Sequence, residues 1–342
     1  MEKFQTSDIP KSPRIQKLVD ALYANMPVIE SARAKLITES YKETEGEPII
    51  TRRAKAFAHI LRNIPIIIRD DELIVGSSTI APRGCQTFPE FSYEWLEAEL
   101  DTVATRTADP FEIAEETKAE LREADKYWKG KTTSELATSY MAPEAIRAIE
   151  HNIFTPGNYF YNGVGHVTVK YWEVLEIGFE GIMAKAQKEL DNCNVGDGDY
   201  ARKSHFLEAV ILSCQAVMDY ADRYAQLARE MAGQTSDPVR RQELLVIAEN
   251  CSNVYTGKQL NLEAAKPQLE AMASYLSSDI WIVNHEGTII MDSSRRLTGS
   301  SIEDFDPTAG GNKPYAIGMY YGMFSDEVLS VSSPITGNFN TY

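Results

Sequence analysis

The residues best suited to chemistry lie in the segment GNYFYNGVGHVTVKYW, from Gly157 to Trp172. Asn158, Asn162 and His166 bring several hydrogen-bond donors and acceptors together, which one cavity could use to hold a polar ligand. The segment lacks the GxxxxGK(S/T) spacing of a phosphate-binding loop, which excludes a nucleotide site of that type. From spacing alone, turn-forming asparagines and a histidine at a helix start explain the pattern better than a binding site does.

The four cysteines do not form a metal or disulfide pattern. They are widely spaced and include no CxxC pair, so we expect reduced, structural thiols and no metal site. Reduced thiols favour a cytoplasmic location. We expect Cys214 and Cys251 to be buried in helices, and Cys193, in a polar linker, to be exposed.

Charge and hydropathy exclude two further classes of partner. The chain carries a net charge of −16 and has no run rich in Lys and Arg, so no nucleic-acid surface is predicted. Its most apolar stretches are short or interrupted by charged residues, so we expect no membrane insertion.

Apolar residues at three- and four-residue steps predict a helical bundle from Ser12 to about Cys251. Asp109 is predicted to cap one of its helices, with Pro110 at the first helical position. DELIVGS (71–77) reads as a short strand or a buried connection. The helices are predicted within residues 14–25, 31–43, 51–63, 109–131, 167–191, 203–233 and 236–251.

The pattern changes after Cys251. Residues 252–342 hold 15 charged residues, against 69 in the preceding 251, and runs with β character replace helical ones. DIWIVNHEGTIIMDSS predicts two strands joined by a hairpin turn, and two more strand-like runs follow. The predicted fold is therefore a mainly α amino-terminal domain (1–252) followed by a smaller α+β domain (253–342).

Four segments resemble, in order and spacing, the glycyl radical enzymes of the pyruvate formate-lyase-like superfamily. They lie between Ser12 and about Cys251, and IRDDELIVGS is the part shared across that superfamily. KTTSELATSYM and YNGVGH are similar to the branch of B12-independent glycerol and propane-1,2-diol dehydratases. The resemblance implies that the helices belong to the larger fold of such an enzyme.

In that family a glycyl radical, installed by a radical-SAM activating enzyme, generates a cysteine thiyl that takes hydrogen from a small diol. The resemblance implies that His166 binds the diol and assists loss of water to give an aldehyde, with Asn158 as a second substrate ligand. No metal or B12 is then needed in this chain. The family's radical glycine and thiyl cysteine lie beyond the resemblance, so we expect the chain to be inactive alone.

Residues from about Tyr255 resemble part of a PAS/Cache-like sensor region of bacterial histidine kinases. The chain then reads as a truncated or chimeric protein. One alternative is a non-catalytic sensing or signalling protein, which a closed sheet with a lined pocket would favour and frayed strands would oppose. A homodimer is another expectation, because apolar helix faces left uncovered tend to find a partner.

Overall fold

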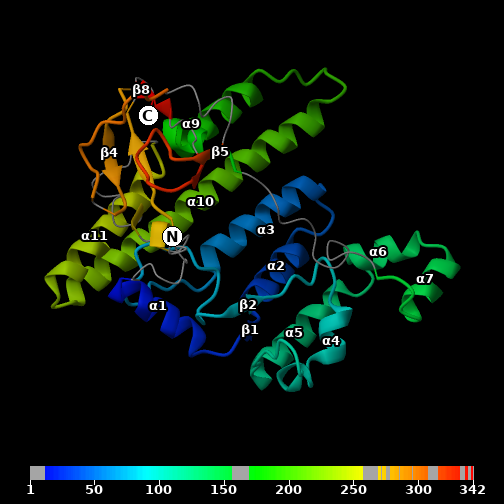
Figure 1. The fold of residues 1–342 in the computed structure, drawn as a ribbon. Helices are drawn as coiled ribbons and strands as arrows, with labels where there is room; N and C mark the ends of the chain where they lie inside the picture. Colours follow the sequence, from blue (N-terminus) through cyan, green and yellow to red (C-terminus); the bar gives the residue numbers. More distant parts are fainter. Residues whose placement is uncertain are drawn as a thin grey trace.

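The computed structural model describes residues 12–155, 169–256, 269–270, 272–274, 278–284, 286–294, 296–306, 315–331, 336–337 and 340–341. In these residues helices dominate, as predicted. The long helix α10 (Tyr200–Gln234) runs through the middle of the molecule, and α3 (Ile49–Asn63), α9 (Tyr171–Asp191) and α11 (Pro238–Asn253) pack along it (Figure 1).

The remaining helices all precede α9 in the chain. The Ser12 hydroxyl accepts a hydrogen bond from the Ile15 amide and begins the first of them. Asp237 caps α11 in the same way, with Pro238 at its first position, which confirms a helix start within the predicted residues 236–251. These helices are α1 (Pro13–Tyr23), α2 (Ala32–Glu43), α4 (Glu94–Glu99), the 3-10 turn η2 (Val103–Thr105), α5 (Glu115–Trp128), α6 (Thr133–Ser139) and α7 (Pro143–Glu150).

The main apolar core lies between α10 and α11, where small side chains allow close packing. Residues 66–77, which include DELIVGS, pack against this core as an irregular connection, so the strand predicted as one of two possibilities is wrong, and the connection is only partly buried, with Ile74 56% exposed. The hydroxyls of Tyr220 and Tyr224 both donate to the Ser77 carbonyl, at 3.3 and 3.2 Å. Arg240 holds the start of the connection through the carbonyls of Arg69 and Glu72.

A second core lies between α2, α4 and α5. Trp128 is buried in a third cluster, with Ile37 of α2 and Ala56 of α3, and its indole nitrogen donates to the Thr38 hydroxyl at 2.8 Å. Beside the second core the parallel strands β1 (Val28–Glu30) and β2 (Gly84–Gln86) pair in register, with Val28 opposite Gly84. The Glu30 carboxylate of β1 also accepts the amides of Ile80 and Ala81, which holds the loop just before β2.

The helix predicted to begin at Asp109 begins at Glu115 instead. Asp109 adopts a positive φ of 49° and caps nothing. The Glu112 amide donates to the Pro27 carbonyl, and the Glu112 carbonyl accepts from the Ile29 amide. Pairing with β1 thus keeps these residues extended, and this tertiary contact overrides the local signal of Asp109 and Pro110.

Helix α6 begins with a complete capping box within the KTTSELATSYM segment. The Thr132 hydroxyl accepts from the Glu135 amide, while the Glu135 carboxylate accepts from the Thr132 amide. Because these bonds satisfy otherwise unpaired donors, Thr132→Ala is expected to lower the free energy of unfolding by about 1 to 2 kcal/mol. Urea titration measures this, with the neighbouring Thr133→Ala as the control expected to stay near the parent value.

The carboxy-terminal residues described form separate antiparallel strand pairs beside α9 (Figure 1). The predicted hairpin is confirmed, with Asn284 accepting two backbone amides in its turn. The buried carboxylate of Asp292 accepts three backbone amides, from residues 294, 296 and 297. The pairs are β3 (Trp281–Val283) with β4 (Ile289–Asp292), β5 (Tyr315–Gly318) with β6 (Val328–Val331), and β7 (Thr336–Gly337) with β8 (Asn340–Thr341).

Candidate functional site

The two predicted site residues, Asn158 and His166, lie outside the described residues. In the sequence they fall between α7 and α9, so the ends of those two helices determine where the intervening chain leaves and returns. Three backbone hydrogen bonds hold the residues that follow α7 against its last turn, the last from the Ile153 amide to the Ala148 carbonyl at 2.9 Å. Asn152 takes a positive φ of 56°, which turns the backbone out of the helix.

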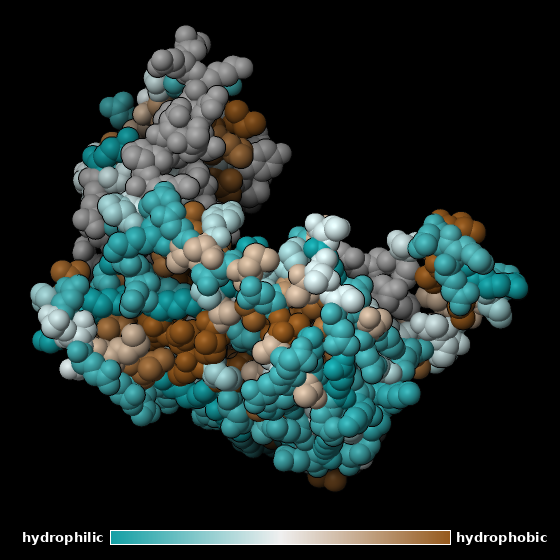
Figure 2. Space-filling model, turned by 90° about the horizontal axis from the view of Figure 1, so that it is seen from below, coloured by the Kyte–Doolittle hydropathy of each residue, from teal (hydrophilic) through white to brown (hydrophobic). Residues whose placement is uncertain are grey.

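The chain that leads to the predicted site projects from the body of the molecule. Helices α6 and α7 extend to one side (Figure 1), and hydrophobic side chains are visible on this projection (Figure 2). Helix α7 has no fully buried residue. After it, Ile153 and Phe154 are 76% and 46% exposed. Large apolar side chains are therefore uncovered immediately before the predicted site.

The chain that follows the predicted site is similarly uncovered. Tyr171, Trp172 and Leu175 lie in the first part of α9 and are all exposed. Glu173, among them, forms ion pairs with Lys170 at 2.7 Å and Lys185 at 2.8 Å. Hydrogen bonds from Lys170 and then Lys185 lower the pKa of the Glu173 carboxyl to about 2, so it remains a carboxylate at neutral pH. Exposed apolar side chains thus precede and follow the predicted site along the chain.

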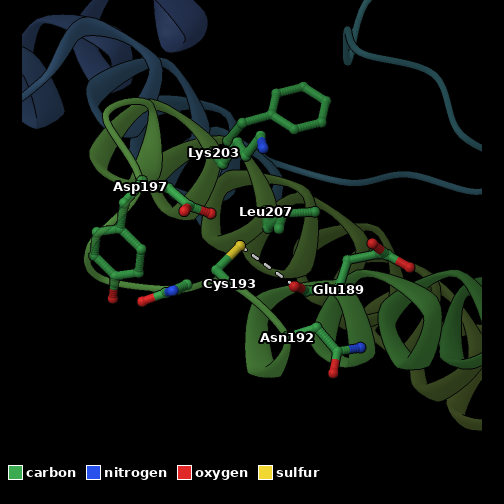
Figure 3. Close-up of a pocket in the computed structure, with 9 residues that line it drawn as sticks. Glu189, Asn192, Cys193, Asp197, Lys203 and Leu207 are labelled. Carbon is green, nitrogen blue, oxygen red and sulfur yellow. Dashed lines mark hydrogen bonds between the residues drawn. The ribbon is translucent and has the colours of Figure 1, made fainter.

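A small cavity lies elsewhere, where the end of α9 turns into α10 (Figure 3). Its volume is about 300 Å³, and Cys193 and Lys203 are among its lining residues. The Cys193 thiol donates to the Glu189 carbonyl at 3.3 Å, and Lys203 pairs with Asp199 at 3.1 Å. The thiol and the ammonium group that line the cavity therefore already have partners within the protein.

The cavity also corrects the prediction that Cys193 is exposed. It is partly buried, because the chain folds back from α9 onto α10. Cys214 is fully buried and Cys251 partly so, and burial raises the pKa of both thiols, to about 11 for Cys251. Thiols that stay protonated are poor nucleophiles. Among the described residues, no group of His, Cys, Asp and Glu has the arrangement of a metal site.

One unusual titratable group was not singled out from the sequence. Asp125 is only 5% exposed, and its Oδ2 atom has no hydrogen-bond partner. Burial, followed by repulsion from Glu97 and Glu94, raises the pKa of its carboxyl to about 7. The available signal was an acid inside the buried stripe of α5, beside Leu121 and Trp128.

Comparison with known proteins places these helices in a larger context. The family described as pyruvate formate lyase-like matches residues 6–276. A structure concerning 1,2-propanediol dehydration in Roseburia inulinivorans is 61% identical, with a TM-score of 0.72, over 80% of this chain and 33% of that one. Glycerol-bound B12-independent glycerol dehydratase from Clostridium butyricum is 47% identical, with a TM-score of 0.72, over 80% and 34%.

A glycyl radical enzyme from Archaeoglobus fulgidus is 33% identical, with a TM-score of 0.67, over 77% of this chain and 34% of that one. The first curated relatives, 32–34% identical, are matched over 30% of their length. This chain therefore spans about a third of the proteins it resembles. The family match continues past the boundary predicted at residues 252 and 253, and that boundary stays a prediction.

Proposed function

Because the chain belongs to the pyruvate formate lyase-like family, we propose that it supplies the amino-terminal third of a glycyl radical dehydratase for a small vicinal diol. The observation that carries the proposal is the 61% identity to a protein whose structure concerns 1,2-propanediol dehydration. The 47% identity to a glycerol dehydratase supports the same substrate class. The product is an aldehyde, with water as the second product.

In this proposal His166 is the catalytic acid and Asn158 a substrate ligand. An imidazole can hold and release a proton near neutral pH, so His166 can protonate the departing hydroxyl group as it leaves as water. The Asn158 amide can orient the diol by donating one hydrogen bond and accepting another. The glycyl radical, installed by a radical-SAM activating enzyme, supplies the hydrogen abstraction that precedes this loss.

The exposed apolar residues around the predicted site are consistent with this role. Ile153, Phe154, Tyr171 and Trp172 precede and follow the segment that contains His166. Covering them with the rest of the family fold removes water from their surroundings, and hydrogen bonds to a substrate strengthen where water is excluded. No described helix is long and apolar enough to cross a membrane.

A hybrid enzyme tests the function and the role of His166 together. Residues 12–251 of this chain replace the corresponding part of the Roseburia inulinivorans protein, and the hybrid is activated anaerobically. We expect aldehyde formation from propane-1,2-diol. The His166→Ala hybrid is expected to be slower by at least about 100-fold, because it lacks general acid catalysis. Aldehyde is measured by a coupled dehydrogenase, and the radical by electron paramagnetic resonance.

His205→Ala, on α10 and only partly buried, is the matched control and is expected to keep the parent rate. A hybrid that carries the radical but forms no aldehyde contradicts the proposed function. A His166→Ala hybrid that keeps the parent rate contradicts the role of His166 alone. Radical yield separates both outcomes from a failure of activation.

The described strands of residues 253–342 do not favour a second function in ligand sensing. A sensing domain was expected to form a closed sheet with a lined pocket. In the part of this region that the structure describes, the strands form three separate pairs. The resemblance to a PAS/Cache region therefore stays a prediction.

A further inference from the structure

Helix α9 is interrupted at Gly178. This residue has φ 64° and ψ 179°, a conformation open essentially to glycine, and it is buried. The helix therefore consists of a first part, Tyr171–Ile177, and a second part that starts again after Gly178. An interruption inside a helix leaves amide groups without acceptors in the preceding turn.

The end of α11 supplies those acceptors. The Phe179 amide donates to the Val254 carbonyl at 3.2 Å, and the Glu180 amide donates to the Tyr255 carbonyl at 3.0 Å. Val254 is the C-cap residue that follows the last residue of α11, so its carbonyl also lacks a partner within its own helix. The positive end of one helix dipole thus meets the negative end of another, which is a favourable arrangement.

The residues that provide these carbonyls are themselves fixed on α10. The Tyr255 hydroxyl donates to the Met218 carbonyl at 3.3 Å, and Arg229 donates to the Ser252 hydroxyl at 2.9 Å. Burial, followed by the nearby Asp222 carboxylate, raises the pKa of Tyr255, so its hydroxyl remains a donor at neutral pH. The chain leaving α11 is therefore held in place.

The first part of α9, Tyr171–Ile177, contains no buried residue. Tyr171, Trp172 and Leu175 are exposed, whereas Ala186 in the second part is buried. Across the interruption, the ion pair of Glu173 with Lys185 links the two parts. The direction of the first part consequently depends on the conformation of Gly178. It also depends on the carbonyls of Val254 and Tyr255, which accept hydrogen bonds from the two amides that follow Gly178.

We propose that Gly178 is a hinge in α9 and that the carbonyls of Val254 and Tyr255 hold it in the bent state. The direction of Tyr171–Ile177 is then coupled to the position of the chain leaving α11. Displacement of Val254 and Tyr255 releases the bend and lets the first part of α9 change direction, while the second part stays packed on α10. This device joins two regions that are far apart in the sequence.

Amide hydrogen exchange of the 342-residue chain tests the hinge, using Tyr255→Phe, which removes the bond to Met218. The amides of Phe179 and Glu180 are expected to exchange about tenfold faster, because their acceptors become mobile. Tyr200→Phe, at a tyrosine with no hydroxyl hydrogen bond among those described, is the matched control and is expected to leave these rates unchanged. Unchanged protection in Tyr255→Phe, or the same increase in both variants, overturns the proposal.

Gly178→Ala gives a second test, because it changes the donor side of the hydrogen bonds to Val254 and Tyr255 instead of the acceptor side. A Cβ atom disfavours the bent backbone, so the carbonyls of Val254 and Tyr255 lose their donors and residues 252–256 are expected to exchange at least about fivefold faster. Gly233→Ala, in α10 with no atom within 4 Å of the added carbon, controls for the added methyl group. Parent rates over residues 252–256 in a folded Gly178→Ala chain contradict the hinge.

Discussion

Replacing Gly84 by alanine is expected to lower the free energy of unfolding by about 3 kcal/mol. Gly84 begins β2 and faces Thr79 in the loop just before it, which the Glu30 carboxylate of β1 holds. A Cβ atom there would lie 2.4 Å from the Thr79 Cβ and 2.7 Å from a carboxylate oxygen of Glu30. Because the Thr79 Cβ is attached directly to the backbone, the loop itself must move to relieve the contact.

Moving the loop also breaks the hydrogen bonds that hold it. The Glu30 carboxylate accepts the amide of Ile80 at 3.0 Å and that of Ala81 at 2.7 Å. Charged acceptors in such bonds contribute more than neutral ones, so their loss adds to the steric cost. Urea unfolding of Gly84→Ala measures the total. Gly198→Ala, with open space around the added carbon, is expected to match the parent, and equal midpoints for both variants would refute the prediction.

The helices were predictable because their signals are local. Asp237 followed by Pro238 marks the start of α11, and apolar spacing marks the buried face of most helices. Asp109 followed by Pro110 carries the same local signal without a helix start. There, bonds from Glu112 to the chain around β1 decide the backbone, and a partner so distant in the sequence cannot be inferred from the spacing of neighbours.

The same distinction applies to the residues of chemical interest. Asn158 and His166 stood out through a motif, and they remain predictions. Gly178 gave no signal, because a glycine within a helical pattern is tolerated and its acceptors come from the end of α11. Asp125 gave only a weak one, because its burial and its repulsion by α4 depend on how two helices meet.

Asp125 leads to the other prediction with a large effect, a pH-dependent loss of stability. Its carboxyl has a pKa of about 7 when folded, against 3.8 for an unperturbed aspartate. Between these values the folded chain binds a proton that the unfolded chain has released, so stability falls as the pH rises. Above pH 7 the folded chain must ionise a buried carboxyl, at a cost approaching about 4 kcal/mol.

Asp125→Asn removes this dependence, because a neutral amide replaces a carboxyl that would ionise. Relative to the parent, the variant is expected to gain about 4 kcal/mol in unfolding free energy between pH 4 and pH 8.5. Glu97→Gln, which removes the first of the two repelling charges, is expected to show a smaller gain. Urea unfolding at both pH values gives this difference directly, and it cancels any constant cost of the buried amide. The prediction is wrong if Asp125→Asn and the parent differ in stability by the same amount at both pH values. That result would show that Asp125 is already ionised near pH 4 in the folded chain, as an exposed aspartate is.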